Sequence, residues 1–361
     1  ENARHALSQA KELGLLGENI LGSGFDFDVS VHRGAGAFVS GESTALMNAL
    51  EGKVGEPRPK YLHTSECGVW NRPSLLNNVE TWANVPLIIN RGSAWFSSLG
   101  TERSKGTKIF SLVGKVNQTG LVEVPMGMSL ADIIYKIGGG IPEGKRLKGV
   151  QTGGPSGGII PERLLDTPVD FEELTRLGSM MGSGSIIVID EDTCAVDLAR
   201  YFVDFLCDES CGKCLPCREG LKRMREILNR IVSGKGEAGD LEVLRETAAL
   251  MKDASLCALG RTAVNPVLST MTYFPEEYAA HIRQKRCPSL SCKPLVSYSI
   301  QPEKCLGCGQ CLKNCPSRAI SEQGDVCAID QSLCSRCGIC FDVCPPKARA
   351  VKKASRGDGT R

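Results

Sequence analysis

The sequence predicts a multidomain α+β protein whose C-terminal part needs metal to fold. Short β-branched runs broken by glycine clusters lie between residues 107 and 190, which is typical of a small α+β domain. Apolar residues then recur at helical spacing as far as about residue 281. The segment 299–361 is rich in cysteine and punctuated by proline. It is too short to bury a large core, so we expect bound metal to stabilise it.

The amino-acid composition limits the classes of function that this protein can have. The 361 residues, 42% of them hydrophobic, are enough for two or three domains with cores of their own. Lys and Arg number 43 against 41 Asp and Glu, a net charge of +2, which disfavours nucleic-acid binding. No apolar run approaches the ~20 residues that span a bilayer, and no secretion signal precedes the first helical stretch. We expect a cytoplasmic protein whose 18 cysteines mostly bind metal.

The first fifty residues predict a strand, a glycine-bearing loop and a short helix. Apolar and polar residues alternate from Phe25 to His32, as in a half-buried strand. The loop from Arg33 matches neither the glycine pattern of dinucleotide-binding loops nor that of nucleoside-triphosphate-binding loops. It suits either an anion at the N-terminus of the helix 45–50 or a plain tight turn. Residues 53–78 lack periodicity and predict an ordered loop of a length that is usually functional.

Helical periodicity begins at Ala195. We expect three helices, two with buried stripes and a third that begins at the N-cap Asp240. The stripes are Val196, Ala199, Phe202, Val203 and Leu206, and then Leu221, Met224, Ile227, Leu228 and Ile231.

A repeat of four cysteines followed by proline is the strongest signal. The first copy runs from Cys305 to Pro316 and the second from Cys334 to Pro345, 29 residues further on. In this spacing three thiolates bind one cubane and the fourth binds its neighbour. We therefore assign one 4Fe-4S cluster to Cys305, Cys308, Cys311 and Cys344, and the other to Cys334, Cys337, Cys340 and Cys315. Paired zinc knuckles are the alternative, but they prefer two-plus-two spacing.

Further cysteines predict two more metal sites. Cys211, Cys214 and Cys217 lie close in sequence, and a helical hairpin would return Cys257 to them, giving a third 4Fe-4S cluster. A structural zinc fits these four as well. His281, Cys287, Cys292 and Cys194 suit zinc, although a histidine beside free thiols is equally compatible. We expect Cys67, Cys207 and Cys327 to be small buried apolar residues.

Four segments carry a resemblance to a known family: residues 33–46, 76–86, 209–214 and 255–260. They resemble the flavin-bearing, NADH-oxidising 51-kDa subunit of respiratory complex I. Because the chain continues into a two-cluster ferredoxin, it is more similar to the β subunit of electron-bifurcating or NADP-reducing [FeFe]-hydrogenases and related formate dehydrogenases. The resemblance covers the whole chain. It implies iron-sulfur rather than zinc at the Cys211 set, and zinc near His281.

The resemblance also implies a fold and its boundaries. We expect part of an FMN-binding α/β domain, a β-grasp-like SLBB domain, a helical 4Fe-4S bundle and a two-cluster ferredoxin domain, with an N-terminal part lying upstream of Glu1. The expected ranges are 1–106 for the C-terminal part of the FMN/NAD(P) domain, 107–190 for SLBB, 191–282 for the bundle, 283–298 for a linker suited to zinc, and 299–361 for the ferredoxin domain and tail.

Cofactor-binding residues follow from the same resemblance. It implies that FMN and the dinucleotide lie against Gly36, Phe38, Gly41, Glu42, Ser43, Lys60, Leu76, Asn77 and Asn78. A solvated loop lysine explains Lys60 equally well. Complex I subunits carry two successive acids where this chain has Glu42 and Ser43. A carboxylate repels the 2′-phosphate of NADP, so its replacement by a hydroxyl predicts tolerance of NADP(H).

The implied function is that of a diaphorase subunit. Electrons would pass between NAD(P)H, FMN and the clusters, with no catalytic acid or base from a side chain. The implied partners are a thioredoxin-like 2Fe-2S subunit, a hydrogenase or formate dehydrogenase catalytic subunit, and ferredoxin. Two alternatives remain: a non-catalytic iron-sulfur relay that has lost flavin, and a scaffold that binds only zinc.

Overall fold

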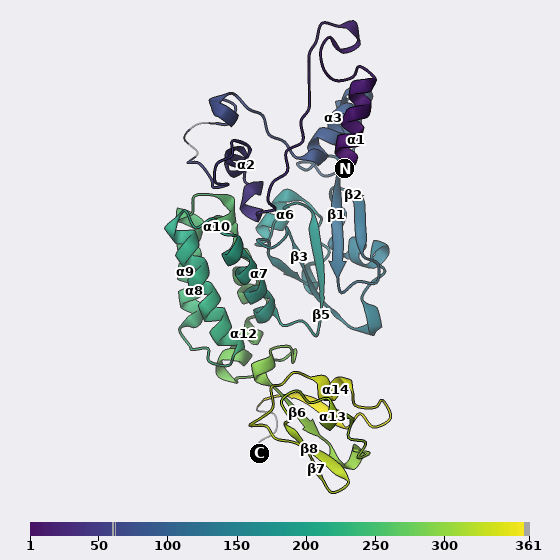
Figure 1. The fold of residues 1–361 in the computed structure, drawn as a ribbon, viewed down its shortest axis with the longest axis vertical. Helices are drawn as coiled ribbons and strands as arrows, with labels where there is room; N and C mark the ends of the chain where they lie inside the picture. Colours follow the sequence, from purple (N-terminus) through teal and green to yellow (C-terminus); the bar gives the residue numbers. More distant parts are fainter. Residues whose placement is uncertain (60, 62, 357–361) are drawn as a thin grey trace. The chain divides into compact units, whose positions relative to one another are not determined.

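The computed structural model describes residues 1–59, 61 and 63–356. Contacts within the chain divide it into two units, Glu1–Leu76 and Asn77–Arg361. Figure 1 labels many of the helices and strands of both units. In the described part of the chain, no helix is both long and apolar enough to cross a membrane.

The described residues of the first unit form two α-helices, α1 (Asn2–Glu12) and α2 (Ser43–Leu50). The strand predicted over 25–32 is wrong. Phe27 forms an isolated bridge with Gly17, and Phe25 is 62% exposed. An alternating pattern makes a strand only where a partner strand pairs with its backbone and a surface covers its apolar face. The described residues of this unit supply a single bridge.

Arg58 orders the long loop that follows α2. Its backbone amide donates to Thr44 Oγ1 at 2.8 Å, and its guanidinium donates to Asn48 Oδ1 at 2.7 Å and to Glu51 Oε1 at 2.6 Å. Hydrogen bonds to Lys53 and Arg58 lower the pKa of Glu51 to about 2. The loop is thus held against α2 by its own side chains, as expected for residues 53–78.

The second unit opens with α3 (Val79–Arg91) and α4 (Ser93–Ser97) and continues into a five-stranded sheet of order β2-β1-β5-β3-β4. Among the pairs of this sheet, β1–β5 is parallel and the others are antiparallel. Apolar residues of the sheet pack against Leu130, Ile133 and Ile134, which are fully buried. This agrees with the α+β fold class expected for this part of the chain. The elements are β1 (Thr107–Gly114), β2 (Gly120–Pro125), α5 (Leu130–Asp132), β3 (Leu147–Thr152), β4 (Ile159–Pro161), α6 (Phe171–Arg176) and β5 (Ser185–Asp190).

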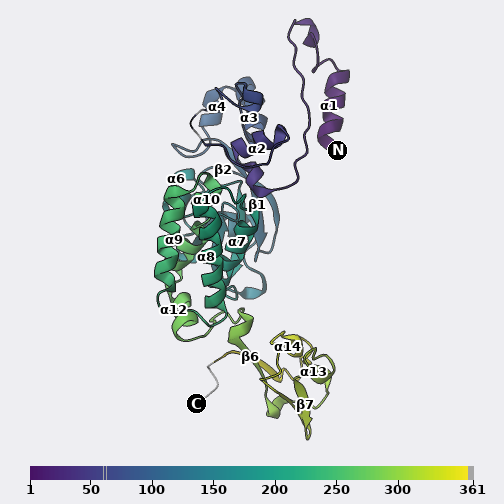
Figure 2. The same cartoon turned by 60° about the vertical axis from the view of Figure 1, so that its left-hand side comes forward.

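A helical bundle follows the sheet, and Figure 2 shows α8 and α9 side by side. Both predicted stripes are buried in it. Asp240 differs from its prediction. It is the first helical residue after Gly239, and its carboxylate accepts the Glu237 amide at 2.8 Å and binds Arg230. The helices are α7 (Ala195–Glu209), α8 (Leu215–Val232), α9 (Asp240–Ala254), α10 (Ala258–Thr262), α11 (Asn265–Tyr273) and α12 (Pro275–Arg283).

The C-terminal part consists of two similar halves. Each half has a short helix that starts after a glycine with positive φ, Gly309 at 67° and Gly338 at 87°. Strand β6 pairs with β9, and β7 with β8, all antiparallel. The sequence repeat therefore corresponds to a repeat of structure. The elements are β6 (Val296–Ile300), α13 (Gln310–Lys313), β7 (Ile320–Gln323), β8 (Val326–Ile329), α14 (Ile339–Asp342) and β9 (Val351–Ser355).

Candidate metal centres and flavin segment

Two cavities in the C-terminal part are each lined by four of the repeat cysteines. One contains Cys305, Cys308 and Cys311 from the first half and Cys344 from the second. The other contains Cys334, Cys337 and Cys340 with Cys315. Each half thus contributes three thiols to its own cavity and one to its neighbour's. The structure brings the eight cysteines together in the two groups that the sequence predicted.

Backbone amides point at the two cysteines that cross between halves. The Ala350 amide donates to Cys344 Sγ at 3.2 Å, and the Ala319 amide donates to Cys315 Sγ at 3.3 Å. Burial raises the pKa of Cys315, but hydrogen bonds from Ser317 and Ala319 outweigh it and leave the pKa lowered. Four sulfur donors, with amide hydrogen bonds to the sulfurs, are the donor set of a 4Fe-4S cluster. The residues present therefore fit that group.

A third group of cysteines lies where the bundle helices begin. Cys214 is the N-cap of α8, Cys217 is in its first turn, and Cys257 is the N-cap of α10. Burial, together with charge repulsion from Cys214, Cys257 and Cys211, raises the pKa of Cys217 to about 11. Four thiolates this close require a compensating cation, which an iron-sulfur cluster supplies.

Gly260 sets the distance between the two cysteine-bearing helices. A Cβ at this position would lie 3.0 Å from Cys217 Cβ and 2.6 Å from Ser255 Cβ. Helix α10 therefore approaches α8 closely because residue 260 has no side chain. The Ser210 hydroxyl also lies 3.4 Å from Cys217 Sγ, within hydrogen-bond reach for sulfur.

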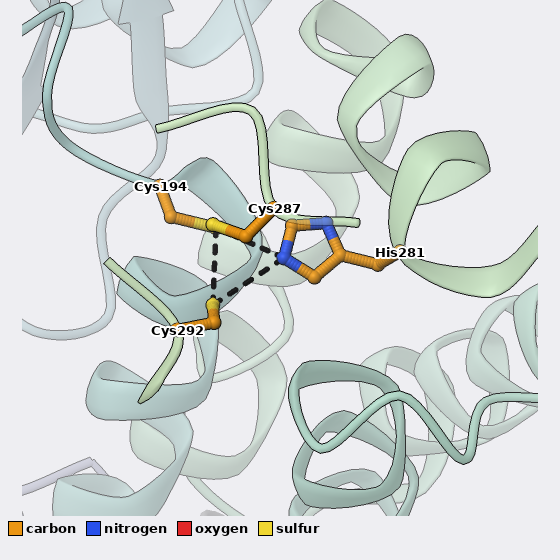
Figure 3. Close-up of side chains that lie close together, drawn as sticks. All are labelled: Cys194, His281, Cys287 and Cys292. Atoms are coloured by element: carbon orange, nitrogen blue, oxygen red, sulfur yellow. Dashed lines mark hydrogen bonds between the residues drawn. The ribbon is translucent and has the colours of Figure 1, made fainter. Parts of the chain in front are cut away.

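A fourth site differs from these three because a histidine joins its three cysteines. Figure 3 shows Cys194, His281, Cys287 and Cys292 converging, and their ligand atoms all lie within 4.8 Å of one another. His281 Nε2 is 3.5 Å from Cys194 Sγ and 3.3 Å from Cys292 Sγ, and the two sulfurs are 3.7 Å apart. Zn–S bonds of about 2.3 Å in a tetrahedron separate sulfurs by about 3.8 Å. The spacing fits one tetrahedral ion.

The imidazole of this fourth site is oriented by a neighbouring carbonyl. His281 Nδ1 lies 2.7 Å from the Glu277 carbonyl oxygen, which can only accept. The proton therefore belongs on Nδ1, and the lone pair of Nε2 faces the thiols. All four side chains are buried, with His281 and Cys287 fully so. Hydrogen bonds from Cys194 and Cys292 lower the pKa of Cys287, which favours a thiolate there.

The carboxylate of Glu277 joins this corner to the sheet. It accepts the Ala195 amide at 2.9 Å, at the start of α7, and forms an ion pair with Lys148 of β3. Lys148 also donates to the Thr193 carbonyl. Both charged side chains are nearly excluded from solvent, with 6% and 13% exposed. Removing one partner of such a buried pair is strongly destabilising, because the other charge is then left uncompensated.

The glycine loop of the first unit is tied to α2 rather than open to an anion. The Glu42 carboxylate accepts the Thr44 and Ala45 amides, each at 2.9 Å, and the Ser43 hydroxyl at 3.3 Å. A carboxylate at these amides occupies the donors that a phosphate would use. The structure thus favours the tight-turn alternative at this helix terminus, and Glu42 acts as the helix cap.

The other predicted cofactor residues lie in both units. Gly36, Phe38 and Gly41 are exposed residues before α2, and Leu76 is exposed at the end of the first unit. Asn77 and Asn78 begin the second unit, and Asn78 is the N-cap of α3. Lys60 lies outside the described residues.

Reasoning from sequence missed Cys327. It is 3% exposed, as expected of an apolar residue, but it lines the cavity of Cys305, Cys308, Cys311 and Cys344. Cys67 and Cys207 are only half-buried. The 29-residue repeat could have pointed to Cys327. It makes Cys327 equivalent to Tyr298, and Tyr298 lines the other cavity.

Family models match most of the chain in order. Residues 1–87 match the Nuo51 FMN-binding domain, 109–160 an SLBB domain and 197–281 the NADH-ubiquinone oxidoreductase-F iron-sulfur binding region. Residues 298–321 and 328–349 match a 4Fe-4S binding domain. The resemblance and the fold expected from the sequence are confirmed, and iron-sulfur binding explains the cysteine groups in the bundle and the C-terminal part.

Curated relatives agree with these matches. The NADP-reducing hydrogenase subunit HndC of Solidesulfovibrio fructosivorans is 53% identical over 88% of this chain, and the alignment covers 65% of its own length. An F-type subunit of the NADH-quinone oxidoreductase of Rhizobium meliloti (strain 1021) is 46% identical over 78% of this chain and 67% of its own. The chain thus spans about two thirds of the length of these relatives.

A solved structure supports the same relationship. The crystal structure of NAD+-reducing [NiFe]-hydrogenase in the H2-reduced state matches with a TM-score of 0.63 and 35% identity, over 69% of this chain and 42% of that one. Sequence, fold and cysteine geometry converge on one conclusion: this chain belongs to the family of the 51-kDa flavin-binding, iron-sulfur subunit of complex I, which includes subunits of NAD(P)-reducing hydrogenases.

Proposed function

We propose that this chain is the diaphorase subunit of a hydrogenase or formate dehydrogenase complex, where it moves electrons between NAD(P)H and one-electron partners. The observation that carries the proposal is the presence in one chain of a complex-I-type cysteine group in the bundle and a ferredoxin-type pair behind it. The cysteine group of the bundle is the one that this chain shares with its complex I relatives. The high identity to a subunit named as part of an NADP-reducing hydrogenase favours a hydrogenase complex.

The residues of this chain hold and tune the redox groups and do not act as acids or bases. FMN, when bound, converts a two-electron hydride into single electrons that 4Fe-4S clusters accept. Cys211, Cys214, Cys217 and Cys257 would hold the cluster of the bundle, and the eight repeat cysteines the other two. Amide donors such as Ala319 and Ala350 stabilise charge on the ligand sulfurs.

Nicotinamide choice follows from Ser43. Its hydroxyl donates to Glu42, whose carboxylate is already engaged by two backbone amides of α2. Residue 43 itself is neutral, so it presents no second negative charge to a 2′-phosphate. We therefore infer that the full-length protein accepts NADP(H), as the name of its hydrogenase relative indicates for that complex.

The tight group at His281 is proposed to hold a structural zinc ion. Four buried protein ligands leave no open coordination position for substrate, which distinguishes a structural from a catalytic zinc. The ligands come from the start of α7, from α12 and from the linker ahead of β6. The ion would therefore fix the start of the ferredoxin-like part to the bundle.

Partners and boundaries complete the proposal. The expected partners are a thioredoxin-like 2Fe-2S subunit, a hydrogenase or formate dehydrogenase catalytic subunit, and ferredoxin, each of which exchanges electrons with a subunit of this kind. The proposed domain ranges are the ones expected from the sequence. Electron bifurcation would require a further branch, for which the ferredoxin-like pair is the candidate.

The test is an anaerobic preparation of the full-length protein. The proposal expects FMN, iron and sulfide in the protein, and reduction of the clusters by NADPH or NADH in the EPR spectrum. Iron and sulfide without FMN, together with clusters that only dithionite reduces, would support the non-catalytic relay. Zinc without visible iron-sulfur absorbance would support the scaffold.

A further inference from the structure

The two halves of the ferredoxin-like part place different residues over their cavities. Strand β6 of the first half carries Tyr298, and strand β8 of the second carries Cys327, 29 residues later. The same offset relates Cys305 to Cys334 and Ile300 to Ile329. Tyr298 and Cys327 are thus equivalent positions of one repeat, with an aromatic ring in the first and a thiol in the second.

Each of these residues faces a different cavity. Tyr298 lines the cavity of Cys334, Cys337, Cys340 and Cys315, and its hydroxyl lies against Gly338. Cys327 lines the cavity of Cys305, Cys308, Cys311 and Cys344. Both side chains are buried, with 6% and 3% exposed. The two proposed clusters therefore have different nearest neighbours.

Cys327 packs beside one of the proposed ligands. It lines the same cavity as Cys311, and the Cys311 side chain packs against the buried cluster that contains Cys327, Val351 and Ile320. A ligand sulfur on iron carries no proton and can only accept, so the proton in this contact belongs to Cys327. Because the contact is shielded from water, its electrostatic effect is larger than at the surface.

We propose that the Cys327 thiol donates a hydrogen bond to the Cys311 ligand sulfur and thereby raises the reduction potential of the cluster held by Cys305, Cys308, Cys311 and Cys344. Reduction adds negative charge to the cluster and its sulfurs, so a donor at a sulfur stabilises the reduced form more than the oxidised one. Cys327 is a positioning and tuning residue in this role. It is not a fifth ligand, because the cavity already contains four cysteines in the ferredoxin pattern.

The inference rests on the proposed function only in that clusters occupy these cavities. The test is an EPR-monitored redox titration of the anaerobic full-length protein with dithionite, which does not require NAD(P)H or FMN to be active. Three proteins are compared with the wild type: Cys327→Ala, Cys327→Ser and Tyr298→Phe. Pulsed EPR in deuterated buffer additionally detects an exchangeable proton coupled to the cluster.

Cys327→Ala is expected to lower one midpoint potential by the equivalent of a five- to tenfold change in its one-electron equilibrium, about 40 to 60 mV at 59 mV per decade. The midpoint potentials of the other two clusters stay unchanged. The pulsed EPR signal of the exchangeable proton coupled to the cluster is lost. Cys327→Ser restores the donor and returns the potential to the wild-type value or above it. Tyr298→Phe leaves this centre unchanged.

Two results would overturn the proposal. One is an unchanged set of potentials in Cys327→Ala with iron content intact, since the thiol then has no effect on any cluster. The other is the loss of about four iron atoms from that variant while Cys327→Ser retains them poorly, since Cys327 would then be a ligand. Clusters that dithionite reduces but NAD(P)H does not would count against the diaphorase function and leave the Cys327 comparison intact.

Discussion

Cys194 Sγ lies 3.5 Å from His281 Nε2, although 87 residues separate the two in the sequence. The contact exists because α7 and α12 pack together and because Glu277, four residues before His281, caps the first turn of α7. Helix α12 therefore supplies one proposed metal ligand, His281, and also holds the segment that carries another, Cys194. The proposed zinc site depends on the packing of the bundle as much as on its four ligands.

Metal analysis tests the zinc site. We expect about one zinc per full-length chain, and we expect Cys292→Ser to remove it without changing the iron content, because three remaining ligands bind the ion much more weakly. Cys207→Ser is the matched control, since this half-buried thiol lies outside the group. Iron in place of zinc at the site, or zinc retained by Cys292→Ser, would contradict the assignment.

Substitution of Glu277 tests the clamp. Glu277→Gln should lower the free energy of unfolding by about 3 kcal/mol, because it leaves Lys148 buried without its counter-charge. Chemical denaturation with zinc and iron contents monitored in parallel gives the measurement. Glu276→Gln, an exposed neighbour in the same turn, is the control. Equal stability of the two variants would show that the buried pair contributes nothing.

Gly260 provides a test of the cluster in the bundle. A methyl group at this position would meet Ser255 Cβ at 2.6 Å and Cys217 Cβ at 3.0 Å. Gly260→Ala should therefore displace Cys217, cost about 1 to 3 kcal/mol, and remove about four of twelve iron atoms per chain. Gly239→Ala has open space around its Cβ and should keep them all. Iron loss in both variants, or in neither, would be evidence against this packing.

Substitution of Ser43 tests the proposed basis for the acceptance of NADP(H). Ser43→Glu places a second carboxylate beside Glu42, and an acid in the first turn of α2 is compatible with the helix dipole. We expect the ratio of NADPH to NADH oxidation to fall about tenfold or more, measured as kcat/KM in the full-length enzyme. Ser30→Glu adds the same charge in an exposed segment and should leave the ratio unchanged. A wild-type enzyme with strict NADH selectivity would end this account of Ser43.

Local patterns in the sequence predicted the metal centres better than the N-terminal fold. The repeat from Cys305 and the stripe from Val196 depend on spacing within a few turns, and both hold in the structure. The alternation at 25–32 needed a pairing strand, and the described residues provide only the Gly17–Phe27 bridge. Periodicity reports which side of a segment is apolar, not whether a partner covers it.

The sequence predicted the cysteine ligands but not the roles of the residues around the proposed sites. Cysteine spacing gave both groups of four, and the structure joined the crossing residues Cys315 and Cys344 to them. Glu42 as the cap of α2 could not be distinguished from a ribose partner, because an acid before a helix serves either purpose. Cys327 was assigned to the core because burial was judged for one residue alone, and the role proposed for it follows from the cavity that it lines together with Cys311.

One measurement tests the central claim most directly: iron and acid-labile sulfide per chain, with EPR spectra taken after addition of NADPH or NADH to the oxygen-free, full-length protein. The account predicts about twelve irons per chain and reduced 4Fe-4S signals that appear with the nicotinamide alone. Fewer than about four irons per chain, or spectra that stay silent even with dithionite, would contradict it.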